Sequence, residues 1–171
     1  WNSLSIVGVA SLTSGLLGLL VGYVVVRTPV RPLGTFLRQV TFLPYLVPGI
    51  AYAAAYLSLF AVPRGPIPAL YGTFALLVIV CVVSYLPYAA KAGTSAMLQV
   101  GPELEEPGLM AGASWFTRLR RILFPIQKST YFSGMLLPFI SVTRELSLLI
   151  LLVTPGTQLA TTITLRYTDR G

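Results

Sequence analysis

The residue types that carry most enzyme chemistry are scarce in this sequence. The 171-residue chain has no histidine, one cysteine and five acidic residues. Three of the acids are grouped at positions 103, 105 and 106, and arginines follow at positions 118, 120 and 121. Histidine is the usual acid–base group near neutral pH and a common zinc ligand, so its absence argues against a histidine-based enzyme or a zinc centre.

The lysines do not belong to a phosphate-binding loop. A GxxxxGK[ST] loop needs a glycine before its lysine, but Lys91 follows Ala90 and Lys128 follows Gln127. We therefore expect no ATP hydrolysis by this chain, no catalytic residue and no cofactor, and any energy must come from a partner or a gradient. The single Cys81 lies in an apolar run, where we expect a small buried hydrophobic residue.

The composition predicts an all-α, polytopic membrane helix bundle. Hydrophobic residues make up 55% of the chain, charged residues 10%, and the mean hydropathy is +0.79, whereas about a quarter of a typical soluble domain is charged. The net charge of +7 could suggest a nucleic-acid partner. Basic cytoplasmic loops are the commoner cause in a membrane protein, so we expect membrane lipid around the chain and no nucleic acid.

Four apolar segments are long enough to predict spans. The first span, 4–26, has 23 residues without a charge, which as a helix would cross the roughly 30 Å hydrocarbon core. It contains Gly18 and Gly22 at a spacing that favours close helix packing rather than an active site. The other predicted spans are 41–60, 69–90 and 126–153, and a long polar loop, 91–125, separates the third from the fourth.

Two spans contain unusual residues. Pro44, Pro48 and Gly49 predict a kinked or broken second span, which would either line a transport path or simply bend. Arg144 and Glu145 interrupt the fourth span, where charges are costly and need a partner or a water-filled path. Glu145 or Arg144 could therefore form a structural contact, for example with carbonyls of the broken span, or act in the pathway.

The distribution of positive charge predicts the orientation. Eight cations lie in or beside the loops 27–40 and 91–125, against three on the opposite side, Arg64, Arg166 and Arg170. Because basic residues accumulate in cytoplasmic loops, we expect the loop 91–125 to be cytoplasmic. The eight are Arg27, Arg31, Arg38, Lys91, Arg118, Arg120, Arg121 and Lys128.

The loop 91–125 combines features of a short helix with those of a membrane-surface segment. Glu103, Glu105 and Glu106 suit the first turn of a helix, and Gly112 supplies a turn or a place for close contact. The stretch 115–123 is amphipathic, so its arginines could remain at the headgroup level. The loop is therefore either an interfacial connector or a docking element for a cytoplasmic protein.

The same residues resemble a motif of the permeases of ABC importers, E-A-A-x3-G-x9-I-x-L-P. Glu106, Gly112, Ile122 and Pro125 stand at its spacing, whereas Pro107, Gly108 and Phe124 depart from it. At Pro107 and Gly108 we expect a helix that starts late or is bent, since both are poor helix formers. The stretches "LPYLVPGIAYA", "SYLPYAAKAGTSAMLQVGPELEE" and "SVTRELSLLILLVTPGTQLATTI" extend the resemblance to iron(III)-type permeases.

The resemblance implies the fold of a type I importer permease core, with about four of its six spans present. It also implies that the loop 91–125 is a coupling loop of a multi-pass protein of the bacterial or archaeal inner membrane. Expected partners are a cytoplasmic ATP-binding subunit, an extracytoplasmic solute-binding protein and a second permease core in the same or another chain. The expected docking residues are Glu103, Glu105, Glu106, Ala111, Gly112 and Ser114.

Alternative functions remain beside this interpretation. The resemblance implies import of iron(III), but permeases for thiamine, sulfate, polyamines and phosphonates are related. An ATP-independent channel or secondary transporter is a second hypothesis, and a membrane enzyme or structural assembly protein is a third. Because the chain starts at Trp1 directly in an apolar segment and ends on a polar one, we expect a fragment of a longer permease.

Overall fold

The computed structural model of the chain describes residues 2–29, 31–63, 65, 68–145, 149 and 151–154, and every regular element in these ranges is helical. The fourth predicted span therefore lies partly outside the described residues. The three cations predicted for the opposite side of the membrane lie entirely outside them, namely Arg64, Arg166 and Arg170. In chain order the elements are α1 (Asn2–Arg27), α2 (Arg31–Phe42), η1 (Leu43–Leu46), α3 (Gly49–Phe60), α4 (Phe74–Gln99), η2 (Pro102–Leu104), α5 (Glu106–Met110), α6 (Trp115–Arg118), η3 (Leu119–Leu123) and α7 (Phe124–Arg144).

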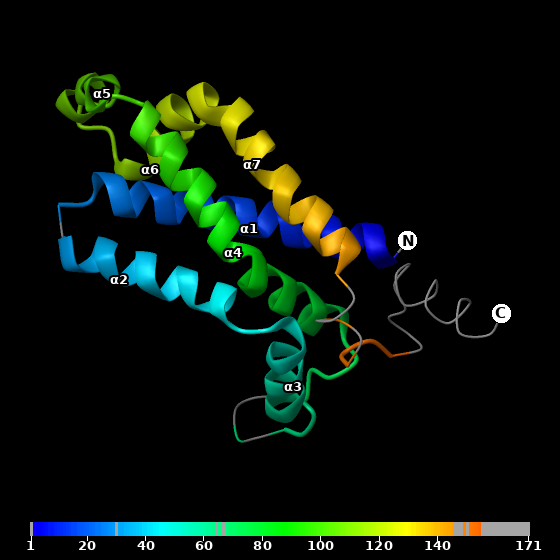
Figure 1. The fold of residues 1–171 in the computed structure, drawn as a ribbon. Helices are drawn as coiled ribbons and strands as arrows, with labels where there is room; N and C mark the ends of the chain where they lie inside the picture. The colour runs from blue at the N-terminus through cyan, green and yellow to red at the C-terminus, as the bar shows by residue number, and fades with distance from the viewer. Residues whose placement is uncertain are drawn as a thin grey trace.

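Helices α1, α4 and α7 form a bundle, with α5 and α6 at one end and the start of α1 at the other (Figure 1). Small residues bring α1 and α4 together, because side chains at these positions would keep the two backbones apart. Gly18 lies against Ala89, and Gly22 lies against Gly93. A Cβ atom added to Gly18 or Gly22 would collide with the backbone of α4. The glycines therefore form a packing interface.

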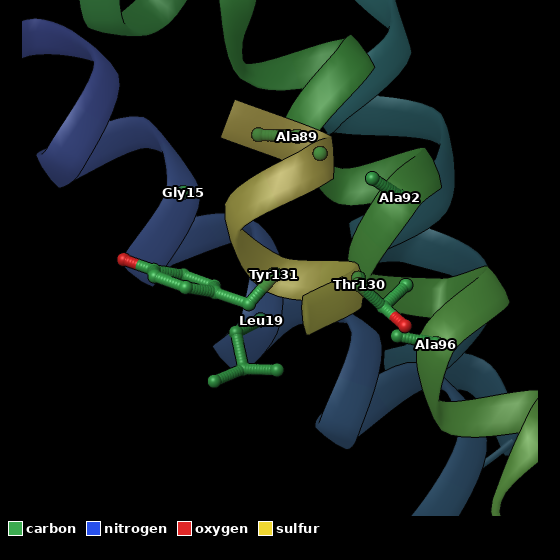
Figure 2. Close-up of a pocket in the computed structure, with 9 residues that line it drawn as sticks. Gly15, Leu19, Ala89, Ala92, Ala96, Thr130 and Tyr131 are labelled. Carbon is green, nitrogen blue, oxygen red and sulfur yellow. The ribbon is translucent and has the colours of Figure 1, made fainter. Parts of the chain in front are cut away.

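The bundle contains two hydrophobic clusters, one toward each end. The first joins the start of α1 to the start of α4, with Ile6, Leu76 and Leu77 fully buried. The second joins Leu19, Met97 and Leu123 near the end that carries α5 and α6. Between them lies a crevice of about 10 Å³, too small for more than one water (Figure 2). Figure 2 shows Gly15 and Leu19 of α1, Ala89, Ala92 and Ala96 of α4, and Thr130 and Tyr131 of α7 around it.

The chain of the second predicted span is broken. Helix α2 and the 3₁₀ turn η1 end at Leu46, and α3 begins at Gly49 at an angle of 103° to them. Val47 and Pro48 adopt extended conformations between them, as expected where proline excludes the helical conformation of its predecessor. Pro44 lies within η1, and Pro48 precedes the first residue of α3.

Helix α4 continues beyond the predicted end of the third span at residue 90. It includes Lys91 and reaches Gln99, because the residues after Lys91 still pack on α1 and α7 through Gly93, Ala96 and Met97. Thr73 caps the start of α4 by accepting a hydrogen bond from the Leu76 amide. The polar segment between the long helices is therefore shorter than the predicted loop 91–125.

A single helical run joins the end of this polar segment to the bundle. Helix α6 passes into η3, a π-helical turn, and then into α7 without an intervening loop. The run ends at Arg144, and Glu145 is extended. The helix therefore ends earlier than the predicted span 126–153.

Within the part of the chain that the structure describes, two helices are long and apolar enough to cross a membrane, namely residues 3–27 and α4. The bent pair formed by residues 31–46 and α3 would make a third if counted as one span. Helix α7 has 21 residues, which gives a length of about 31 Å. It contains polar residues such as Gln127 and Lys128 near its start. A membrane location for α7 remains a prediction.

Candidate functional site

The segment 100–123, here called the interhelical segment, folds into a compact structure at one end of the bundle (Figure 1). Helix α5 begins at Glu106 and ends at Met110. It includes Pro107 and Gly108, so the helix does not start after this pair, and the bend expected there stays a prediction. Proline fits in the first turn because its missing amide hydrogen would have no partner there.

Gly112 terminates α5 by adopting a left-handed conformation, with φ of +72°. The Gly112 amide donates to the Leu109 carbonyl and the Ala113 amide donates to the Gly108 carbonyl, both at 2.9 Å. This is the Schellman pattern of hydrogen bonds, which favours glycine because a Cβ atom is strained in that conformation. A Cβ atom at Gly112 would have no neighbour within 4 Å, so a turn rather than a close contact explains this glycine within the chain.

Gly108, near the start of the sequence motif, packs against Ile122, near its end. A Cβ atom added there would lie 3.0 Å from Cδ1 of Ile122 and 3.4 Å from the aliphatic part of Arg118. Helix α5 therefore packs across η3 with little space between them. A small residue at position 108 and a branched one at position 122 fit each other in this contact.

Five of the six predicted docking residues lie on the outside of the interhelical segment. Glu103, Glu106, Ala111, Gly112 and Ser114 are exposed, and we call these five the docking surface. Two large apolar side chains that the sequence interpretation did not select accompany them, Leu109 at 59% and Met110 at 88% exposure. Their position between the acids and the terminating glycine was the only available signal.

The sixth predicted docking residue, Glu105, points into the protein and is 8% exposed. Its carboxylate forms an ion pair with Arg27 of α1, at 2.8 Å between Nε and Oε1, and another with Arg118 at 3.5 Å. Tyr23 donates a hydrogen bond to Glu105 at 3.4 Å. Tyr23, Arg27, Glu105 and Arg118 together are called the Glu105 cluster.

Both arginines of the Glu105 cluster also bind backbone carbonyls. Arg27 donates to the carbonyls of Val100 at 2.5 Å and Met97 at 3.4 Å, where α4 ends. Arg118 donates to the carbonyl of Ala113 at 2.8 Å and to the Tyr23 hydroxyl at 3.3 Å. The hydrogen bond to Tyr23, and then the pairing with Glu105, raise the pKa of Arg118 above its ordinary value. Both contacts favour the charged form of this arginine.

The predicted intramembrane charges are separated by the end of α7. Arg144 is exposed, whereas Glu145 is half-buried and accepts a hydrogen bond from the hydroxyl of Tyr85 on α4. The same hydroxyl lies 3.5 Å from the carbonyl of Ser141. Glu145 thus contacts α4. The sequence interpretation considered an interhelical pair or carbonyls of the broken second span as the structural alternatives to a pathway role.

A groove of about 700 Å³ lies between α1, α2 and α4. Arg38 and Lys91 contribute positive charge to its walls, and the ring of Tyr45, at the break after α2, contacts the ring of Tyr88 beside it. None of the described residues around the groove is acidic. The charged side chains that line the groove are therefore both positive.

The fold and sequence both resemble known transport proteins. The chain superimposes on a chain of the MetNI methionine ABC transporter, solved in inward-facing conformations, with a TM-score of 0.74 and 18% sequence identity. The match covers all of this chain and 79% of that one. It establishes a likeness of fold, in agreement with the predicted all-α permease core.

Two curated relatives carry the same description. The chain is 28% identical over 170 residues to the ferric transport system permease protein FbpB of Actinobacillus pleuropneumoniae. It is 30% identical over 158 residues to a putative FbpB of Haemophilus influenzae. These matches cover 99% and 92% of this chain, but the chain spans only 24% of the length of each relative.

The family of binding-protein-dependent transport system inner membrane components matches residues 14–170. The match includes most of the helical bundle and the whole interhelical segment. This chain belongs to that family, and the predicted resemblance to ABC importer permeases of the iron(III) type is confirmed.

Proposed function

We propose that the chain is part of the transmembrane permease of an ATP-driven importer, and that its docking surface binds a separate cytoplasmic ATP-binding subunit. The exposure of Glu103, Glu106, Ala111, Gly112 and Ser114 on one compact segment carries the proposal. A rigidly terminated helix end that projects from the bundle offers a protein partner both polar and apolar contacts.

The docking surface combines two kinds of contact. Glu103 and Glu106 supply negative charge, which favours a basic groove on the partner. Leu109 and Met110 supply apolar area, and flexible methionines adapt well to a partner's surface. The left-handed turn at Gly112 fixes the direction in which α5 presents these residues.

Iron(III) is the proposed solute because both curated relatives are named as ferric transport permeases. Among the described residues, no three His, Cys, Asp or Glu side chains are grouped as a metal site. Solute selection would then belong to an extracytoplasmic binding protein. Uptake assays of the complete transporter with iron(III), thiamine, sulfate, a polyamine and a phosphonate would identify the solute.

Substitution of Gly112 tests the docking proposal in the complete transporter. We expect Gly112→Trp to reduce ATP-driven uptake at least tenfold, because the indole would stand on the docking surface, while membrane abundance remains within about twofold. Gly112→Asn is the matched control, because asparagine tolerates the left-handed conformation and adds a small side chain. Uptake and co-purification of the ATP-binding subunit are measured for each variant.

Normal ATP-driven uptake by Gly112→Trp would contradict the proposed docking surface. Uptake that continues without ATP, on a solute or ion gradient, would instead support the alternative of a secondary transporter. Loss of membrane abundance in both variants would place the effect in folding, and the proposal would then lose its support from Gly112.

A further inference from the structure

Glu105 differs from the neighbouring acids in its burial and its contacts. Glu103 and Glu106 are exposed, whereas Glu105 is the one charged residue that is buried in the part of the chain that the structure describes. The side chains of its partners Arg27 and Arg118 are only 14% and 13% exposed. A buried carboxylate is tolerated where opposite charges and hydrogen bonds compensate it.

The Glu105 cluster joins the end of α1 to the end of α4 and to the interhelical segment. Tyr23 and Arg27 belong to the last turns of α1, and Arg27 also holds the carbonyls of Met97 and Val100 at the end of α4. Arg118 belongs to α6 and holds the carbonyl of Ala113, directly after the turn at Gly112. Glu105 itself directly precedes α5.

These contacts determine how a force on the docking surface would be transmitted. If α5 were displaced, Glu105 would move with it, because the two are adjacent in the chain. Separating Glu105 from Arg27 and Arg118 would leave charges unpaired in a site that excludes most water, which is costly. The ends of α1 and α4 would therefore move together with α5.

We infer that Glu105 is a positioning residue that transmits displacement of the docking surface to the C-terminal ends of α1 and α4. This inference rests on the proposed function, and it adds a specific role for a residue that does not itself touch the partner. Docking and transmission then depend on different side chains of the same segment. A change at Glu105 should leave binding of the ATP-binding subunit intact and reduce the solute moved for each ATP hydrolysed.

The test compares Glu105→Gln with Arg120→Gln in the complete transporter reconstituted in liposomes. Both variants remove one charge from the interhelical segment, but Arg120 is exposed and belongs neither to the docking surface nor to the Glu105 cluster. For Glu105→Gln we expect co-purification of the ATP-binding subunit within twofold of the unmodified protein and a fall of at least fivefold in uptake per ATP hydrolysed. Glu105→Asp, which keeps the charge, should restore part of this ratio, and Arg120→Gln should leave it unchanged.

The outcomes separate this inference from the proposed function. If the unmodified chain fails to retain an ATP-binding subunit, the proposed function is wrong, and the inference falls with it. If the subunit is retained and Glu105→Gln has the same uptake per ATP as Arg120→Gln, only the inference is wrong. A variant that loses abundance and uptake in proportion, with an unchanged ratio, shows a merely structural role and overturns it as well.

A milder variant decides the question if Glu105→Gln does not accumulate in the membrane. Tyr23→Phe removes the hydroxyl that contacts both Glu105 and Arg118, while both ion pairs remain. A reduced ratio of uptake to ATP hydrolysis in this variant supports the inference. An unchanged ratio overturns it.

Discussion

At the scale of single residues, the polar contacts differ in what they join. The Glu105 cluster connects the interhelical segment to two long helices, whereas the hydrogen bond from Tyr85 to Glu145 connects α4 to the end of α7. The three neighbouring acids at 103, 105 and 106 cannot be distinguished by sequence. The inward direction of Glu105 depends on Arg27 and Tyr23, which only the folded chain brings near. Exposure of the other acids follows from local helix chemistry and could be predicted.

The contact between Tyr85 and Glu145 predicts a stability effect. We expect Tyr85→Phe and Glu145→Ala each to lower the melting temperature of the purified transporter, because loss of a hydrogen-bond partner inside the protein costs about 1–3 kcal/mol. The double variant should be no less stable than the more harmful single variant, since the two residues share one interaction. Uptake per inserted copy, measured alongside, should change little. A large loss of uptake at unchanged melting temperature would favour a pathway role for Glu145.

At the scale of elements, hydrophobicity predicts where helices exist better than where they end. The charge of Lys91 suggested the end of a span, but small residues after it continue to pack in the bundle, so α4 extends to Gln99. A lysine near a helix end can keep its ammonium group in a polar region while its stem stays in the helix. The break near Pro48 could be predicted because proline removes a backbone donor and restricts its predecessor. The angle of 103° between the two halves of this broken span could not be predicted from the sequence.

The interface between α1 and α4 predicts a position-specific effect of glycine substitution. We expect Gly22→Leu to reduce membrane abundance several-fold, because its side chain would collide with the backbone at Gly93 and overpacking typically costs about 1–3 kcal/mol. Gly8→Leu is the matched control on the same helix, since nothing lies within 4 Å of a Cβ atom there. Immunoblots of membrane fractions measure the abundance of both variants. Equal abundance of the two variants would contradict the close approach of these helices.

At the scale of the whole molecule, the interhelical segment and the loop after α3 lie at different ends of the described bundle (Figure 1). The charge distribution predicts the side of the membrane that each occupies, because lysine and arginine counts do not depend on details of packing. The shared fold could be predicted from the motif spacing and its flanking stretches. The contacts of the complete permease could not, because the chain spans only 24% of the curated relatives' length.

Cysteine labelling tests this orientation. Met110 and Val62 are exposed at 88% and 56%, and the native Cys81 is buried, so it should contribute little background. We expect a membrane-impermeant thiol reagent applied outside spheroplasts to modify Val62→Cys but not Met110→Cys. After membrane disruption and removal of the ATP-binding subunit, which would cover position 110, both should react. Labelling of Met110→Cys from outside in intact spheroplasts would reverse the predicted orientation.

The π-helical turn at η3 has a consequence for the spacing of the sequence motif. Such a turn contains one residue more than an α-helical turn, and in a regular α-helix one residue corresponds to a rotation of about 100°. Ile122 lies inside this turn and faces Gly108 of α5. The wider turn absorbs this extra residue, so α6 and α7 keep nearly the same relative rotation as in a regular α-helix one residue shorter. The π-helical turn therefore lets the motif keep nine residues between Gly112 and Ile122 without turning α6 away from the bundle.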